Sequence, residues 1–169
     1  AELKSAEDVD AVVHETEHAP FTVKTVKRTD KQRSPSPPFT TSTMQQEASK
    51  ALNFSTQKTM RVAQQLYEGV DVKGHGTIGL ITYLRTDSTR VAEEADKTAR
   101  AFIEEQYGSQ YVSQRESERK ASGKIQDAHE AIRPTNIALT PTQVKESLSR
   151  DQFRLYQLIW KRFAASRMA

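Results

Sequence analysis

Residues 79–89, GLITYLRTDST, place a tyrosine and an arginine two positions apart in a run whose pattern indicates an extended strand. Because side chains alternate between the two faces of a strand, Tyr83 and Arg85 are expected to share one face with Ile81. The two leucines of the run fall on the opposite face, where they can be buried. The sequence therefore predicts a phenol beside a guanidinium on the face opposite the leucines.

The side chains of Tyr83 and Arg85 suit an attack on a phosphodiester. A phenol is a potential oxygen nucleophile, although an unperturbed pKa of about 10 leaves it mostly protonated at neutral pH. A fixed cation can orient the phosphate, favour the phenolate and stabilise negative charge on the phosphoryl oxygens. A tyrosine in a strand is more often a packing residue and a nearby arginine is more often solvated, so the spacing alone leaves both interpretations open.

The composition of the 169-residue chain limits the classes of protein to which it can belong. Hydrophobic residues make up 36% and charged residues 28%, which allows one ordinary domain with a lean core. No run approaches about 18 consecutive apolar residues, so no membrane association is expected. Cysteine is absent, which excludes disulfides and fits a cytoplasmic location. The four histidines are scattered and no Cys/His cluster has metal-site spacing, so no bound metal is expected in this chain.

The start of the chain differs in pattern from the rest. Residues 21–27 alternate apolar and polar side chains, which predicts a half-buried strand whose partner strands lie outside this chain. Residues 24–33 hold five basic side chains against one acidic one, and this run can track a phosphate backbone or be a solvated hinge. The proline-rich residues 31–38 predict a stiff connector, so we expect a domain boundary between residues 1–38 and residues 39–169.

Helical patterns begin at Ser42. Ser42 and Gln45 have the spacing of a capping box at the start of one helix, and Ser55 can cap the next. Gly69 stands where a glycine ends a helix, so the two helices and their tight turn predict a helix-turn-helix. The four glycines of residues 69–79 indicate a hairpin or wing-like loop that leads into the predicted strand.

The second half of the chain continues the helical pattern. A third helix is expected over residues 91–107, and the polar residues 114–124 predict a mobile loop. Residues 128–132 indicate a short helix that ends before Pro134. An apolar stripe at helical spacing predicts a buried C-terminal helix with these side chains in the core: Phe153, Leu155, Tyr156, Leu158, Ile159, Trp160 and Phe163. The expected fold class is therefore mainly α. The chain lacks a first Met and ends on this apolar pattern, so we expect a piece of a longer protein.

Three segments resemble motifs of bacterial type IA DNA topoisomerases, and they occur in the order of that family. Residues 38–48, PFTTSTMQQEA, are similar to the start of the family's tyrosine-bearing domain. Residues 79–89 resemble its active-tyrosine segment, and residues 128–135, AHEAIRPT, resemble its histidine motif. The resemblance covers nearly the whole chain and is weakest over the first twenty residues and over residues 109–124.

This resemblance implies a fold and a domain organisation. Residues 39–169 would form a helical gate domain whose helix-turn-helix core is similar to the DNA-binding domain of the catabolite activator protein, with a short strand or hairpin. Residues 1–38 would form the end of a β-rich arch or hinge domain, with the residue 21–27 strand at its edge, followed by the connector. Val91 stands where relatives are expected to have a helix-capping serine or threonine, so a weak start is expected for the third helix.

The resemblance also implies the chemistry. Tyr83 would attack a phosphodiester of single-stranded DNA and become joined to the 5′ phosphate, while the other strand passes through the protein-bridged gap. The freed 3′ hydroxyl would then reseal the break, which relaxes negative supercoils without a nucleotide cofactor. Arg85 would orient the phosphate, and His129 would contact the scissile phosphate or relay a proton.

The residues expected to contact DNA lie in two of the motifs. They are Arg85, Thr86, Ser88, His129 and Arg133. Without the motif, a histidine such as His129 is more often held by a backbone carbonyl than catalytic. Arg133, four residues later on the predicted short helix, either touches phosphate or pairs with an acid such as Glu130.

The family also uses an acidic Toprim domain that binds Mg²⁺ through a glutamate and an Asp-x-Asp-x-Glu run, and no such run occurs here. The resemblance therefore implies that Mg²⁺ belongs to the parent enzyme and that this fragment alone is inactive. The expected partners are single-stranded DNA and the remaining domains of the parent. We expect a monomer in the bacterial cytoplasm, at the nucleoid.

Two other interpretations remain open. The first is a non-catalytic helix-turn-helix module that binds DNA, which the predicted helix pair and the basic run over residues 24–33 favour. Only Lys58 and Arg61 are available on the second helix, which is few for reading base edges. The second is a hinge or partner-binding fragment that touches no nucleic acid. Substitution of Tyr83 by phenylalanine distinguishes both from a topoisomerase, because only a catalytic Tyr83 would form a covalent adduct with DNA that this substitution removes.

Overall fold

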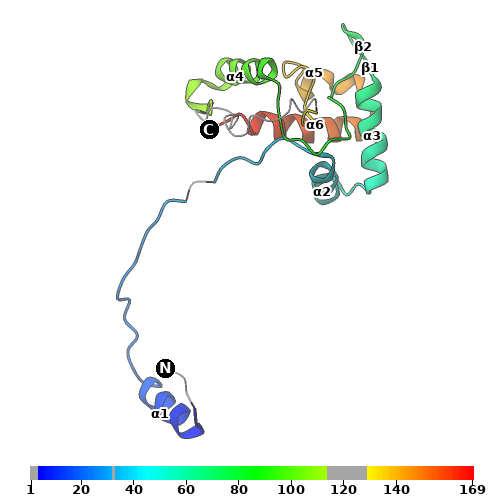
Figure 1. Ribbon diagram of the computed structural model, residues 1–169. Helices are drawn as coiled ribbons and strands as arrows, with labels where there is room; N and C mark the ends of the chain where they lie inside the picture. The colour runs from blue at the N-terminus through cyan, green and yellow to red at the C-terminus, as the bar shows by residue number, and fades with distance from the viewer. Residues whose placement is uncertain (1–3, 32, 114–128) are drawn as a thin grey trace. The chain divides into compact units, whose positions relative to one another are not determined.

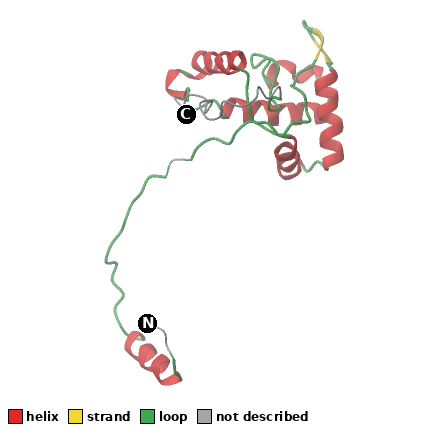
Figure 2. Ribbon diagram, in the orientation of Figure 1, coloured by secondary structure: helices red, strands yellow, loops and turns green. Residues whose placement is uncertain are grey.

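The computed structural model describes residues 4–31, 33–113 and 129–169 and divides the chain into two units, residues 1–33 and residues 34–169. Figures 1 and 2 show the elements of each unit. The loop predicted over residues 114–124 lies outside the described residues. None of the described helices has both the length and the apolar character that a membrane crossing requires.

The first unit contains one helix, α1 (Ala6–Thr16), among its described residues. Ser5 and Asp8 form a capping box at its start, and none of its residues is buried. The sequence analysis did not predict this helix, although a serine followed three positions later by an acid is the signal of such a start. The apolar side chains of α1 make no core within this unit.

No strand forms over residues 21–27 in the described structure of this chain, so the strand predicted there, with its partner strands outside the chain, stays a prediction. Phe21, Val23 and Val26 are 89%, 81% and 73% exposed. The physical reason is that a lone strand has no neighbour to accept and donate its backbone hydrogen bonds. The assignment of residues 1–38 to an arch or hinge domain stays a prediction.

The second unit is mainly helical, as predicted (Figure 2). Its described elements are α2 (Thr41–Leu52), α3 (Thr56–Glu68), β1 (Val70–Val72), β2 (Gly76–Ile78), α4 (Glu93–Tyr107), a 3₁₀ turn (Ser109–Tyr111), α5 (Pro141–Val144), a second 3₁₀ turn (Lys145–Ser147) and α6 (Arg150–Ala165). β1 and β2 pair as an antiparallel hairpin, which confirms the hairpin predicted for the glycine-rich segment.

The start of α2 differs from the prediction. Thr40, not Ser42, is the N-cap, because its extended backbone lets its hydroxyl accept the N–H of Thr43. The Thr43 hydroxyl in turn accepts the N–H of Thr40, at 2.9 Å, so the capping box lies two residues earlier than predicted. The predicted cap of α3 is confirmed, since the Ser55 hydroxyl accepts the N–H of Lys58.

α6 runs through the middle of the second unit and packs against α2, α3 and α5 (Figure 1). Most of its apolar stripe is buried as predicted, with Tyr156, Trp160 and Phe163 at 0%, 8% and 2% exposure, but Phe153 and Leu158 are only half-buried. The Tyr156 hydroxyl donates to the carbonyl of Leu139 at 2.6 Å, and the Trp160 indole N–H donates to that of Ile137 at 2.9 Å. These two bonds tie the chain that follows the histidine motif to the core helix.

Candidate functional site

The segment that carries Tyr83 and Arg85 is not the strand predicted from its sequence. Within it only Ile81 pairs, in an isolated antiparallel bridge with Pro134, and the backbone bends at Thr82. The predicted alternation holds for exposed Tyr83 and Arg85, but it fails at Ile81, which is 1% exposed. A bend changes the direction in which successive side chains project, so the period of two does not extend across residue 82.

Tyr83 presents its phenol at the surface. Tyr83 is 48% exposed, and its ring meets the ring of Tyr67 edge-on at a centroid distance of 5.4 Å. Within the described part of the chain, the Tyr83 hydroxyl forms no hydrogen bond and the exposed Arg85 guanidinium forms no hydrogen bond or ion pair. Both groups are therefore available to a ligand that reaches this surface.

Thr41, the first residue of α2, holds the backbone on both sides of Arg85. Its hydroxyl accepts the N–H of Thr86 at 2.8 Å and lies 2.8 Å from the carbonyl oxygen of Leu84, to which it can donate. Its own N–H donates to the carbonyl of Thr86 at 2.9 Å. The motif at residues 38–48 is thus bonded directly to the segment with the tyrosine.

Thr82 joins the tyrosine segment to the histidine motif. Its hydroxyl donates to the carbonyl of Ala131 at 2.7 Å and accepts the N–H of Arg133 at 3.0 Å. The N–H of Thr82 donates to the carbonyl of Arg133 at 2.9 Å, and the N–H of Ile132 donates to that of Phe39 at 2.8 Å. The three motifs that are far apart in the sequence are therefore neighbours in the fold.

His129 is exposed and belongs to this junction, but the helix predicted around it is wrong. Residue 128 lies outside the described residues, and residues 129–132 form no helix. The N–H of Ala131 donates to the carbonyl of Arg90 and that of Ile132 pairs with Phe39, so neither is available for a helical bond. The carbonyl of His129 accepts a bond from the Arg90 side chain at 3.2 Å.

Arg133 pairs with Glu130 at 2.7 Å, which was one of the two alternatives left open. The two side chains are only 12% and 19% exposed, and Arg133 also donates to the carbonyl of Pro134 at 3.0 Å. The second carboxylate oxygen of Glu130 accepts the N–H of Ala92 at 2.7 Å. Glu130 therefore caps α4, whose own N-cap residue Ala92 supplies no side-chain bond.

Thr86 and Ser88 shape the backbone after Arg85. The Thr86 hydroxyl accepts the N–H of Ser88 at 3.1 Å, and the Ser88 hydroxyl accepts the N–H of Arg90 at 3.1 Å. Such local bonds from threonine and serine hydroxyls stabilise turns. Contact of either residue with DNA stays a prediction.

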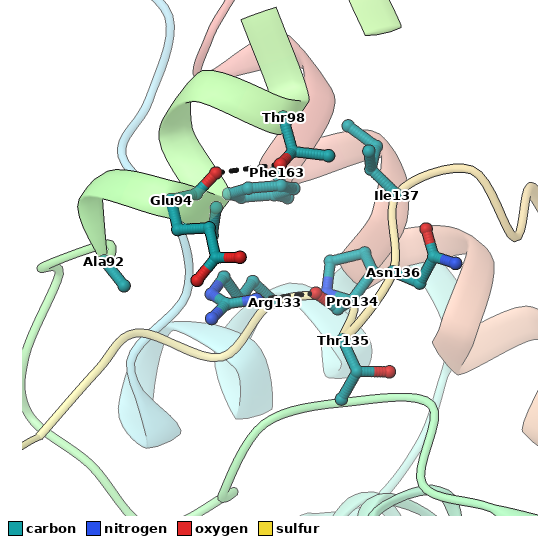
Figure 3. A pocket seen from close by; sticks show the side chains of 10 residues that line it. Ala92, Glu94, Thr98, Arg133, Pro134, Thr135, Asn136, Ile137 and Phe163 are labelled. Carbon is teal, nitrogen blue, oxygen red and sulfur yellow. Dashed lines mark hydrogen bonds between the residues drawn. The ribbon is translucent and has the colours of Figure 1, made fainter.

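A pocket of about 460 Å³ lies next to this junction, between the start of α4 and residues 133–137. Figure 3 shows that Glu94 and Arg133 both line it. The Nε of Arg133 is buried there without a hydrogen-bond partner among the described residues. Tyr83, Arg85 and His129 do not line the pocket, so the candidate site is the open surface around Tyr83.

The anchoring roles of Thr41 and Thr82 were not predicted from the sequence, and Glu130 was predicted only as a possible partner of Arg133. The bonds that the prediction missed join each of these residues to a partner 38 to 51 residues away in the chain. No local pattern signals such a bond. In residues 4–31, 33–113 and 129–169, moreover, no three His, Cys, Asp or Glu side chains gather in a group that could hold a metal ion.

Comparison with known proteins gives two findings. A family described as DNA topoisomerase matches residues 1–169, the whole chain. The structure of full-length topoisomerase I from Thermotoga maritima is similar, with 51% sequence identity and a TM-score of 0.71. That match covers 82% of this chain and 21% of the Thermotoga chain, so this chain spans about a fifth of the length of that protein.

Proposed function

This chain belongs to the bacterial type IA DNA topoisomerase family, and from this premise we propose that it supplies the nucleophile that cleaves one DNA strand. The observation that carries the proposal is the pair of exposed, unbonded side chains of Tyr83 and Arg85 on a backbone that Thr41 and Thr82 hold in place. The proposed substrate is single-stranded DNA within a negatively supercoiled duplex. The proposed location is the bacterial cytoplasm, at the nucleoid.

In the proposed reaction the phenol oxygen of Tyr83 attacks the phosphorus of a phosphodiester. An O–P bond to Tyr83 forms as the bond between phosphorus and the 3′ oxygen breaks, so the 5′ phosphate becomes joined to the protein. The phenol loses its proton and the departing 3′ oxygen gains one. After the other strand passes through the gap, the 3′ hydroxyl attacks the phosphotyrosine and restores the original bonds, so no nucleotide cofactor is consumed.

Arg85 is proposed to orient the phosphate and to stabilise the charge that develops on its oxygens. The support for this role of Arg85 is electrostatic, because no acidic partner neutralises its guanidinium within the described structure. His129 is proposed to contact the scissile phosphate or to move a proton at the phenol or the leaving oxygen. Thr86, Ser88 and Arg133 complete the proposed DNA contacts, of which Arg133 has the weakest support because it already pairs with Glu130.

The remaining parts of the proposal lie outside this chain. Mg²⁺ is proposed to bind the Toprim domain of the parent enzyme. The residues described here do not fit a metal site, and no step above uses a metal. We propose that this chain acts as a monomer within the parent, as a gate that carries Tyr83, and that the isolated chain is inactive without its partner domains.

Adduct trapping tests this proposal. The parent enzyme would be incubated with Mg²⁺ and end-labelled single-stranded DNA, then denatured, and the residue joined to DNA would be mapped. We expect an adduct at Tyr83 that Tyr83→Phe eliminates. Tyr107→Phe is the matched control, since Tyr107 is also 48% exposed but lies on α4. An adduct that persists in Tyr83→Phe would contradict the proposal.

A non-catalytic DNA-binding module is the second candidate, because α2 and α3 do form a helix pair joined by a tight turn. Two observations weaken it. Lys58 on α3 pairs with Asp151 at 2.7 Å, and its ammonium group also lies over the Phe54 ring. Arg61 is therefore the one basic residue of α3 that has no ion pair within the described structure. A folded parent that binds DNA and never forms an adduct would favour this candidate.

A further inference from the structure

We infer that Thr41 is a positioning residue for the proposed cleavage reaction and acts through the backbone on either side of Arg85. The inference rests on the proposed function, and it gives a role to the motif at residues 38–48, which the chemical steps do not use. Thr41 would touch neither DNA nor phosphate. Its effect would come from where it holds the segment that carries Tyr83 and Arg85.

The Thr41 hydroxyl is bonded only to that segment in the part of the chain that the structure describes. It accepts the N–H of Thr86 at 2.8 Å and can donate to the carbonyl of Leu84 at 2.8 Å or of Thr86 at 3.1 Å. The Thr41 N–H adds a bond to Thr86 at 2.9 Å. One residue therefore holds both chain neighbours of Arg85.

These contacts are not explained by the start of α2. The capping box there consists of Thr40 and Thr43, whose hydroxyls satisfy each other's N–H groups at 2.9 and 3.3 Å. A helix start with both bonds present does not require the hydroxyl of the intervening Thr41. Its hydroxyl serves the tyrosine segment instead.

The opposite side of the segment has its own anchor. Thr82 is bonded to Ala131 and Arg133, and the Leu84 side chain is 1% exposed. The backbone is thus held at residues 82, 84 and 86, while the side chains of Tyr83 and Arg85 between them stay exposed. A reacting group that is misplaced by about 1 Å can lose about 100-fold in rate, so such anchoring has a direct catalytic consequence.

Thr41→Val tests the inference in the full-length parent enzyme, because it removes the hydroxyl and keeps the branched shape. With Mg²⁺ and saturating single-stranded DNA, the single-turnover rate of cleavage is expected to fall at least about tenfold. The Kd for that DNA is expected to stay unchanged, since the cations that bind phosphate are intact. Thr41→Ser keeps the hydroxyl and is expected to restore the rate. If Thr41→Val does not fold, Thr41→Ala removes the same hydroxyl with a better helix former, and the same fall is expected.

Thr43→Val is the matched control, because it removes a hydroxyl from the same turn and weakens the capping box. We expect it to lower the melting temperature without slowing cleavage. An equal loss of rate in Thr43→Val would mean that any weakening of α2 suffices, and this would overturn the inference. Cleavage at the wild-type rate by Thr41→Val, with an adduct that Tyr83→Phe still eliminates, would overturn it and leave the proposed function standing. A wild-type parent that forms no adduct would overturn both.

Discussion

Tyr83 and Tyr156 have the same phenol in opposite surroundings. Tyr156 on α6 is 0% exposed, and its hydroxyl donates to the carbonyl of Leu139 at 2.6 Å. Tyr83 is 48% exposed, and its hydroxyl forms no hydrogen bond within the described structure. Burial raises the pKa of Tyr156 well above its usual value, which keeps that phenol a neutral donor. The difference shows that the surroundings, and not the residue type, decide which phenol is open to a ligand.

The largest expected effect separates activity from stability at Tyr83. Tyr83→Phe is expected to abolish the covalent adduct while it changes the free energy of unfolding by less than about 0.5 kcal/mol, because the lost hydroxyl is exposed and unbonded. Adduct mapping and denaturant unfolding of the same preparation would measure both. A marked loss of stability would show that the Tyr83 hydroxyl has a structural role and would remove the contrast with Tyr156.

The opposite outcome is expected at Tyr156. Tyr156→Ala would leave a large cavity beside Leu155 and Ile159 and is expected to lower the free energy of unfolding by about 3–5 kcal/mol. Denaturant unfolding followed by the fluorescence of Trp160 would measure this change. A loss under about 1 kcal/mol would mean that the core around α6 collapses to fill the space.

Tyr156→Phe isolates the buried hydroxyl. It leaves the Leu139 carbonyl without its donor and is expected to cost about 1–3 kcal/mol near neutral pH. Because the folded state holds the pKa of Tyr156 above its unfolded value of about 10, the unfolded state loses that proton first. The stabilisation that comes from the raised pKa of Tyr156 is fully present below about pH 10 and is lost as the pH rises further. Above about pH 10, the free energy of unfolding should therefore fall more in wild type than in Tyr156→Phe. If the free energy of unfolding changed with pH in the same way for the two proteins, the raised pKa of Tyr156 would be contradicted.

The smallest expected effect concerns the ring next to Tyr83. The edge-on contact with Tyr67 is a pair of partly exposed rings, and such pairs contribute about 0.5–1.5 kcal/mol beyond buried area. Tyr67→Leu is therefore expected to lower the free energy of unfolding by about that amount, whereas Tyr67→Phe keeps the ring and should be neutral. Thermal unfolding of the two variants would compare them, and equal values would mean that the ring contact contributes nothing measurable.

Local sequence signals predicted the elements whose bonds are local. Ser55 caps α3, as its position before the second helical pattern predicts. The cap of α2 was placed two residues late, because Ser42 with Gln45 has the sequence pattern of a capping box, whereas in the structure the Thr43 hydroxyl completes the box with Thr40. Most of the apolar stripe of α6 was predicted correctly because helical periodicity reflects burial, although Phe153 and Leu158 are only half-buried.

The predictions around the site were less accurate, since its bonds are not local. The segment of Tyr83 has the alternation of a strand, but its backbone groups pair with Thr41 and with the chain after His129 instead of with one neighbouring strand. Residues 128–132 were predicted as helix, but the N–H groups of Ala131 and Ile132 donate to the carbonyls of Arg90 and Phe39. In both cases a partner elsewhere in the chain overrides the local preference.

The sequence alone determined the mainly helical class of this protein, its hairpin, and the motifs that identify Tyr83, Arg85 and His129 as the residues of interest. These follow from periodicity, capping and short-range patterns, in which each residue acts on near neighbours. The sequence left open whether Arg133 pairs with Glu130, and the structure shows this pairing. Only the tertiary structure decided that Thr41 and Thr82 hold the tyrosine segment, that Glu130 binds the N–H of Ala92 at the start of α4, and that Tyr83 is exposed. Hydrogen bonds between segments about 40 to 50 residues apart depend on how the helices pack, and no local pattern encodes them.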